Sequence, residues 1–155
     1  MLKRIDIRGG KLTYEQRIEL GELFAGDKTE VEKFKETFRI LHEITPDFGD
    51  TEGMKMYVEY FQQIMDGLRF WFEKEKLLLD YKPEPEEIRA GIRELSEKTG
   101  HFGTIKTLAK NYARDPDDIL KWEYGKVFGI LYTDLEEYKY QKRLYKQHET
   151  KKGKW

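Results

Sequence analysis

Residues 54–80 read MKMYVEYFQQIMDGLRFWFEKEKLLLD, and the spacing of apolar side chains in this stretch predicts the longest helix of the chain. Apolar residues recur at alternating steps of four and three positions, and only Glu75 interrupts the series. Such steps keep side chains on one face of an α-helix, where a single stripe is enough for packing against a core. This first stripe consists of Met54, Val58, Phe61, Met65, Leu68, Phe72 and Leu79.

A second apolar stripe, formed by Tyr60, Ile64, Gly67 and Trp71, lies beside the first. The helix is therefore apolar on more than half of its circumference, so it is either central in the fold or presents one face to a partner. In the second case Tyr60, Ile64 and Trp71, grouped around Gly67, form a candidate surface for binding an amphipathic helix.

Capping residues place two more helices before this stretch. Thr13 with Gln16 and Thr29 with Glu32 have the spacing of capping boxes, in which two side chains satisfy free backbone N–H groups at a helix start. The first of these helices is expected to run to about Ala25.

Two later helices begin with proline in the first turn, where the missing N–H group is harmless. The first runs from Pro85 to Gly100, a short helix follows over 104–112, and Pro116 starts a long last helix that fades into a frayed basic tail at 141–155. In the helix that starts at Pro85, the residues expected to face inward are Ile88, Ile92 and Leu95.

Residues 3–8 alternate in polarity with a period of two, which predicts a short strand ended by Gly9 and Gly10. A single strand in a helical chain leaves its edges unpaired, and isolated strands are rarely stable. We therefore expect residues 1–10 to pair with the same strand of another copy or with a partner, or to lie as an extended arm.

Composition favours one domain over residues 1–155, because chains of this length usually form a single core. Hydrophobic residues make up 38%, there is no cysteine, and no apolar run is long enough to span a membrane. The predicted fold is mainly α, an irregular bundle of about five to six helices with one short N-terminal β-strand. We expect the protein to remain in the cytoplasm.

The sequence contains no pattern typical of a catalytic, metal or cofactor site. His42, His101 and His148 are scattered, and none has a second ligand at helical spacing. The single serine, Ser96, lacks the glycine turn of a hydrolase nucleophile, and no phosphate-binding glycine motif occurs. We therefore expect no cofactor and no enzymatic activity.

Residues 104–124 have the outline of a helix-turn-helix, because two helical segments are joined by a short turn. This alternative predicts a DNA-binding regulator. However, Asp115, Asp117 and Asp118 lie at the start of the second helix, where they would repel phosphates. Binding to nucleic acid is therefore the weaker interpretation.

The last helix offers another surface for a partner. Gly125 and Gly129 lie one turn apart, and glycines inside a helix each cost about 1 kcal/mol, so close approach of another helix is a reasonable compensation. Trp122, Phe128 and Tyr132 flank them, and the five residues together predict a groove that accepts an amphipathic helix.

Several segments resemble small helical proteins from the tail modules of bacteriophages and prophages, the tail assembly chaperones. The likeness spans most of the chain but includes no catalytic motif. The segments are RGGKLTY at 8–14, QRI at 16–18, FGTIKTLA at 102–109, WEYGKVF at 122–128 and DLEEY at 134–138.

The resemblance implies a non-enzymatic role in the cytoplasm of a bacterial host. Proteins of this family hold the apolar, helix-rich tape measure protein soluble while tail tube subunits are recruited around it. The competing interpretations are the DNA-binding regulator and a small enzyme of unknown class. No role of a family residue transfers to a position of this chain. The candidate binding residues are therefore chosen only because they lie on apolar faces of the predicted helices.

Overall fold

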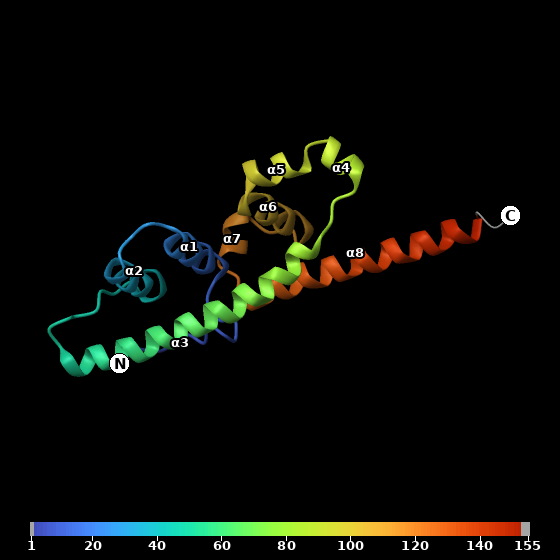
Figure 1. The fold of residues 1–155 in the computed structure, drawn as a ribbon. Coiled ribbons are helices and arrows are strands. Elements are labelled where there is room, and N and C mark those ends of the chain that lie inside the picture. Colours follow the sequence, from blue (N-terminus) through green and yellow to red (C-terminus); the bar gives the residue numbers. More distant parts are fainter. Residues whose placement is uncertain (1, 153–155) are drawn as a thin grey trace.

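The computed structural model describes residues 2–152, with only the backbone at Asp80 and Lys152. Within this range the chain forms eight α-helices and one 3-10 helix, without a β-sheet (Figure 1). The prediction of a mainly helical fold is confirmed, although the helices outnumber the five to six predicted. They are α1 (Tyr14–Ala25), α2 (Glu30–His42), α3 (Thr51–Glu75), η1 (Lys76–Asp80), α4 (Pro85–Arg89), α5 (Ile92–Thr99), α6 (His101–Asn111), α7 (Pro116–Leu120) and α8 (Tyr124–Lys152).

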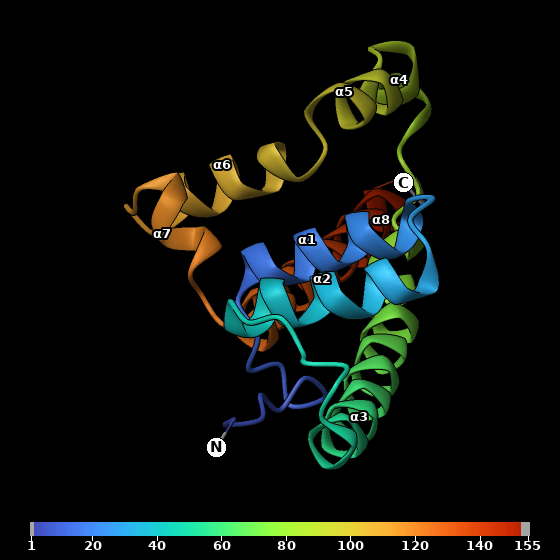
Figure 2. The ribbon, with the colours of Figure 1, turned by 90° about the vertical axis from the view of Figure 1, so that its left-hand side faces the viewer.

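Two long helices, α3 and α8, form the axis of the molecule (Figure 1). The helices α1 and α2 pack on one another beside α3, and α4 to α7 form an arch over α1 (Figure 2). No helix within residues 2–152 is both long and apolar enough to span a membrane.

The two capping boxes predicted from the sequence are confirmed. The hydroxyl of Thr13 accepts a hydrogen bond from the backbone N–H of Gln16 at 3.1 Å, and the Gln16 side chain accepts one from the N–H of Thr13 at 2.9 Å. Thr29 and Glu32 make the same reciprocal pair. Helix α1 ends at Ala25, as predicted.

The helix predicted from Pro85 to Gly100 is wrong, because the chain breaks between α4 and α5. Gly91 has a φ of 89°, a left-handed conformation that interrupts the helix. Ile88 and Leu95, expected to face inward, are 42% and 56% exposed, so the two short helices bury few of their apolar side chains.

The predicted last helix also divides, because α7 stops at Leu120 and α8 starts at Tyr124. Between them the backbone bonds to the start of α1 and to the N-terminal segment, residues 2–13: the carbonyl of Trp122 accepts from the N–H of Tyr14 at 2.9 Å, and the N–H of Tyr124 donates to the carbonyl of Leu12 at 2.7 Å. These bonds take the place of helical ones, which explains the break.

The strand predicted over residues 3–8 is not present. Ile7 and Gly10 instead lie in a tight turn, with the N–H of Gly10 bonded to the carbonyl of Ile7 at 2.9 Å. The described residues contain no strand with which residues 3–8 could pair, so backbone groups of Ile5 and Ile7 bond to side chains of α3. The indole N–H of Trp71 donates to the carbonyl of Ile7 at 2.6 Å, and the N–H of Ile5 donates to the hydroxyl of Tyr60 at 2.8 Å.

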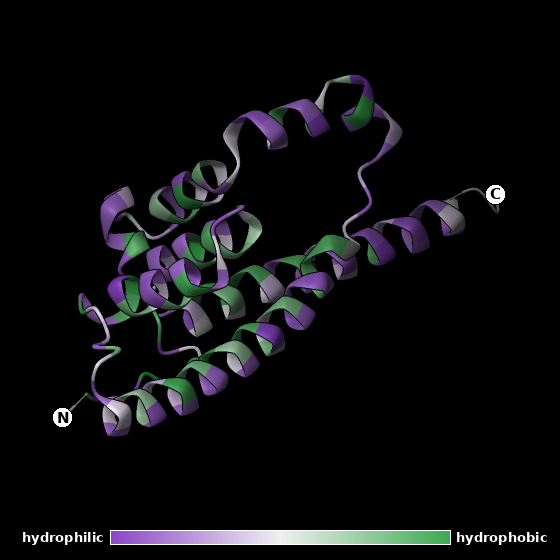
Figure 3. Ribbon diagram, turned by 60° about the vertical axis from the view of Figure 1, so that its left-hand side comes forward, coloured by the Kyte–Doolittle hydropathy of each residue, from purple (hydrophilic) through white to green (hydrophobic). Residues whose placement is uncertain are grey.

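The basic residues from 141 to 152, expected to be frayed, continue α8 as a helix. Beyond the body of the molecule this helix is largely hydrophilic (Figure 3). The connector before α4 contacts it through an ion pair between Glu84 and Lys142 and through the rings of Tyr81 and Tyr138. The remainder of the predicted tail, 153–155, lies outside the described residues.

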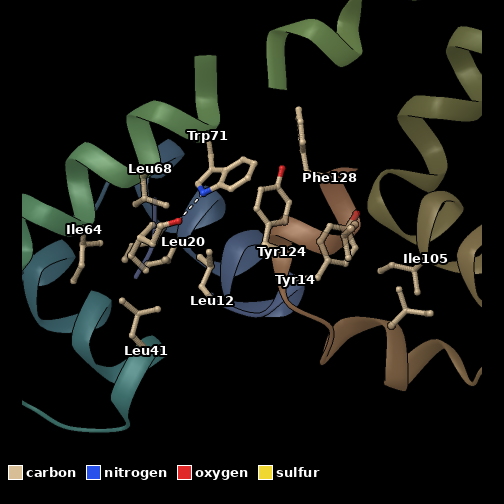
Figure 4. Close-up of a cluster of buried hydrophobic side chains, with 14 of the residues drawn as sticks. Leu12, Tyr14, Leu20, Leu41, Ile64, Leu68, Trp71, Ile105, Tyr124 and Phe128 are labelled. Atoms are coloured by element: carbon tan, nitrogen blue, oxygen red, sulfur yellow. Dashed lines mark hydrogen bonds between the residues drawn. The ribbon is translucent and has the colours of Figure 1, made fainter. Parts of the chain in front are cut away.

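One hydrophobic core joins residues that are far apart in the sequence, from Ile7 to Phe128 (Figure 4). At its centre Trp71 of α3 makes edge contacts with Tyr124 and Phe128 of α8, at ring distances of 5.1 and 5.3 Å. Ile7 and Leu12 of the N-terminal segment are 3% and 0% exposed. The N-terminal segment is therefore part of the core and not a separate arm.

A close approach between two glycines fixes this segment on α8. A Cβ atom on Gly10 would lie 2.5 Å from the Cα of Gly125, and Gly10 has a φ of 73°, which L side chains rarely adopt. The sequence-based expectation that a backbone approaches Gly125 closely is correct, but the approaching backbone is an irregular segment and not a helix.

We expect Gly10→Ala to lower the free energy of unfolding by about 2 kcal/mol or more, because it combines a backbone clash with a strained φ. Gly129→Ala is the matched control, since a Cβ there meets nothing within 4 Å. It should raise stability by about 0.5–1 kcal/mol, as alanine does inside a helix. Urea unfolding followed by circular dichroism measures both, and a harmless Gly10→Ala would contradict the packing described here.

Candidate functional site

The surface predicted around Gly67 is covered by the chain's own N-terminal segment. Tyr60, Ile64 and Trp71 are 1%, 0% and 7% exposed. A Cβ on Gly67 would lie 2.7 Å from the Cβ of Ile7, so the space that the glycine leaves is already filled. This prediction of a free partner surface is wrong, because a segment more than fifty residues away in the sequence occupies it.

The groove predicted on α8 does not form either. Gly125 is covered by Gly10, and Phe128 is buried against Trp71. Trp122 is half-buried on another side, in edge contact with the ring of Tyr112 at 5.5 Å and with the ammonium of Lys126 at 4.1 Å from its ring centre. The two remaining residues, Gly129 and Tyr132, are open to solvent but make no groove.

The first apolar stripe of α3, not the second, is partly exposed. We call its part within α3 the α3 seam: Met54, Val58, Phe61, Met65, Leu68 and Phe72. Val58 and Phe72 are 45% and 58% exposed, and Leu68 is buried. Met54, Phe61 and Met65 are half-buried. Hydrophobic and hydrophilic residues accordingly alternate along the visible side of α3 (Figure 3).

Two hollows lie along the α3 seam. One, of about 380 Å³, lies between α3 and α1, where Leu20 and Phe24 of α1 face Met65, Leu68 and Phe72. The other, of about 420 Å³, lies farther toward the N-terminus of α3 and is shallow. Its lining includes Met54 and Val58. Phe24 is half-buried and Leu20 is fully buried, and nothing in the sequence of α1 alone indicates which of its apolar side chains line a hollow.

The exposed apolar surface continues onto α2 and onto the loop between α2 and α3. The ring of Phe34 lies 5.0 Å from that of Phe61 and 6.0 Å from that of Phe48, between centroids. Phe48 is 49% exposed and Val31, one turn before Phe34, is 57% exposed. Contiguous exposed apolar side chains of this kind mark sites of interaction with other proteins.

Searches against protein families, curated proteins and solved structures found no match to this chain. The assignment of a function therefore rests on the surfaces of the molecule and on the resemblance of its segments.

Glu75, which interrupts the apolar series, is held in a polar cluster at the end of α3. Its carboxylate accepts two hydrogen bonds from Arg17, at 2.6 and 3.0 Å, and one from the hydroxyl of Tyr124. Side-chain exposure is 16% for Arg17 and 24% for Glu75. Bidentate contact with a guanidinium is among the stronger ion pairs, which explains an acid at this position.

Two tyrosines stack within the same cluster. Tyr14 and Tyr124 have parallel rings 6.1 Å apart, and His101 meets the edge of Tyr14. Burial, and then the nearby charge of Glu75, raise the pKa of the Tyr14 hydroxyl. Burial, and then the hydrogen bond to Glu75, raise the pKa of Tyr124. Both hydroxyls are therefore protonated at neutral pH.

A hollow of about 590 Å³ opens beside this cluster, between α1, η1, α6 and α8. Its polar lining includes Arg17, Glu75 and Tyr124, which bond to one another, and also Glu22, His101 and Thr104. A carboxylate engaged in this way is poorly placed to act as a general base. The polar cluster is best explained as structural.

A histidine joins α2 to the N-terminal segment through Tyr60. The Nε2 atom of His42 lies 2.7 Å from the hydroxyl of Tyr60, which also accepts the N–H of Ile5. A neutral imidazole accepts the proton of this hydroxyl, so each group has a partner. Burial lowers the pKa of His42 and raises that of Tyr60.

Neither a metal site nor a nucleic-acid interface stands out. Residues 2–152 contain no group of three or more His, Asp or Glu side chains arranged to hold a metal ion. In the segment predicted to resemble a helix-turn-helix, α7 has five residues, and Asp115, Asp117 and Asp118 are exposed at its start. A helix this short presents few side chains to base edges, and its acids oppose phosphates.

We expect Glu75→Ala to destabilise the protein by about 1–3 kcal/mol, because Arg17 and Tyr124 lose their shared acceptor. Glu73→Ala is the matched control, since Glu73 lies two residues before Glu75 on α3 and makes an exposed ion pair with Lys76 of η1. Its effect should stay within about 0.5 kcal/mol. Urea midpoints measure both variants, and equal midpoints would show that the cluster contributes no special stability.

The lowered pKa of His42 predicts a loss of stability in acid. The unfolded chain binds this proton at its ordinary pKa of about 6.5, whereas the folded chain takes it up only at lower pH. The stability that depends on a neutral His42 is therefore complete above about pH 6.5 and is lost progressively as the pH falls below that value. His42→Gln should flatten this part of the curve of melting temperature against pH between about 5 and 7. Parallel curves for the two proteins would refute the role of His42.

Proposed function

We propose that this protein is a non-enzymatic tail assembly chaperone of a bacteriophage or prophage. It binds apolar helical segments of the tape measure protein, keeps them soluble in the cytoplasm of the bacterial host, and helps to recruit tail tube subunits. The proposal joins the resemblance of segments such as 102–109 and 122–128 to one observation, the open apolar surface of the α3 seam.

The seam suits a chaperone because it offers apolar contact without enclosing its ligand. Val58 and Phe72 protrude from α3, and the hollow beside Phe24 accepts side chains from another helix. Large apolar side chains at the centre of such a surface provide most of the binding energy. A ligand held in this way is released without a change of fold.

The DNA-binding regulator is the weaker alternative. Its would-be recognition helix, α7, has five residues and starts with exposed acids. Nanomolar binding to a defined operator at ~150 mM salt would favour the regulator and overturn the chaperone proposal.

Co-expression tests the proposal. A fragment of the tape measure protein encoded near this chain should move from the insoluble to the soluble fraction when the chain is present, and both should copurify. Phe72→Ser should reduce the recovered complex at least about fivefold, in line with the ~1 kcal/mol or more that an exposed interface aromatic contributes.

Phe102→Ser is the matched control, because Phe102 on α6 is 61% exposed against 58% for Phe72. It should leave the amount of complex unchanged. Failure of the unmodified chain to keep the fragment soluble would refute the function, whereas equal losses with both variants would refute the α3 seam as its site.

A further inference from the structure

We infer that the ligand of the α3 seam is a long amphipathic helix with a seven-residue apolar repeat and an acidic flank, which packs along α3 as a coiled coil. This inference rests on the proposed function, because it names the class of partner for the same seam. It follows from three features of α3: the period of the seam, the face that remains open, and the charges beside that face.

The period of the seam requires a helical partner with the same repeat. Steps of four and three average 3.5 residues, slightly less than the 3.6 of a straight helix, and a stripe with this period stays in contact only with a helix that supercoils around it. From Met54 to Phe72 the seam covers 18 steps, or about 27 Å at 1.5 Å per residue. A ligand helix of at least about 20 residues matches this length.

The buried side of α3 fixes the direction from which the ligand approaches. In heptad notation Met54, Phe61 and Leu68 occupy d positions, and Val58, Met65 and Phe72 occupy a positions. The residues before the a positions are the g positions, and two of them, Ile64 and Trp71, are buried in the protein's own core. The ligand therefore packs on the other side, next to the e positions.

Two of the three e positions within α3 carry positive charge. The e positions are Lys55, Gln62 and Arg69, and the two cations each have a side-chain exposure of 72%; Lys76, which continues the series, lies in η1 and is 54% exposed. Each cation forms an ion pair with an acid three residues before it on α3. Exposed pairs of this kind contribute little, so the cations remain able to exchange partners.

The lining of the hollow between α1 and α3 has the same sign. Its charged residues are Arg17, which is already paired with Glu75, and Arg69, both cations, and the other residues that line it are apolar or glycine. In a coiled coil, e positions pair with g positions of a parallel partner or with e positions of an antiparallel one. Acids at these positions of the ligand would complement α3, and lysines there would be repelled.

The charges also weigh against a second copy of this chain as the occupant. Two α3 seams in antiparallel contact would place e-position cations such as Lys55 and Arg69 opposite one another. In parallel contact the e positions would face g positions that are buried, including Ile64 and Trp71. A foreign helix with an acidic flank fits better than self-association.

Two synthetic 28-residue peptides test the inference. Both carry leucine and isoleucine at a and d, one has glutamate at every e and g position, and the other has lysine there. Like charges at these positions keep each peptide from pairing with itself. By fluorescence anisotropy at ~50 mM salt, the glutamate peptide should bind the full chain at least about tenfold more tightly than the lysine peptide does. Added salt should reduce this difference in affinity between the two peptides.

Charge reversal provides the decisive comparison. The double variant Lys55→Glu/Arg69→Glu should lose or invert the preference for the glutamate peptide. The matched control Lys106→Glu/Lys110→Glu changes two exposed lysines of α6, one turn apart and outside the seam. This control should keep the preference for the glutamate peptide. Phe72→Ser should weaken binding of the glutamate peptide about fivefold or more.

Equal binding of the two peptides, or a preference that survives the reversal at positions 55 and 69, would overturn the inference. Either result together with a tape measure fragment kept soluble would leave the proposed function standing. The opposite combination, a clear preference for the acidic helix without any effect on the tape measure fragment, would support the coiled-coil seam and refute the proposed function.

Discussion

The hydrogen bond from the indole of Trp71 to the carbonyl of Ile7, at 2.6 Å, is the contact on which the rest of the structure depends. The same indole contacts Tyr124 and Phe128, so one side chain joins the N-terminal segment, α3 and α8. With the N-terminal segment seated on this face of α3, the helix has one face in the core. The α3 seam is left partly outside, where α1 and α2 cover only one of its edges.

Local signals were read correctly from the sequence, because they involve neighbours in the chain. The two capping boxes and the end of α1 depend on residues within one turn, and they lie where the sequence places them. The break at Gly91 and the gap between α7 and α8 were missed. The first depends on a left-handed φ, and the second on hydrogen bonds to Leu12 and Tyr14, which are distant in sequence.

The site was harder to predict, because both stripes of α3 have the same kind of spacing. Periodicity identifies apolar faces but does not say which of them the chain will cover. The choice depends on Ile7 filling the space beside Gly67, and on Gly10 lying against Gly125, contacts for which neither partner carries a local signal. For the same reason the alternation of polar and apolar residues around Ile5 and Ile7 indicates a strand, although the side chains of both residues pack on the hydrophobic core.

The bonds between the N-terminal segment and the start of α8 also determine when the chain can finish folding. Tyr124, which donates to the carbonyl of Leu12, leaves the ribosome 112 residues after it. During synthesis α1, α2 and α3 are therefore complete before the contact that secures the first residues exists. Closing so long a loop is slow compared with forming local helices. Until α8 emerges, the nascent chain carries apolar surface that the finished protein conceals, which exposes it to aggregation.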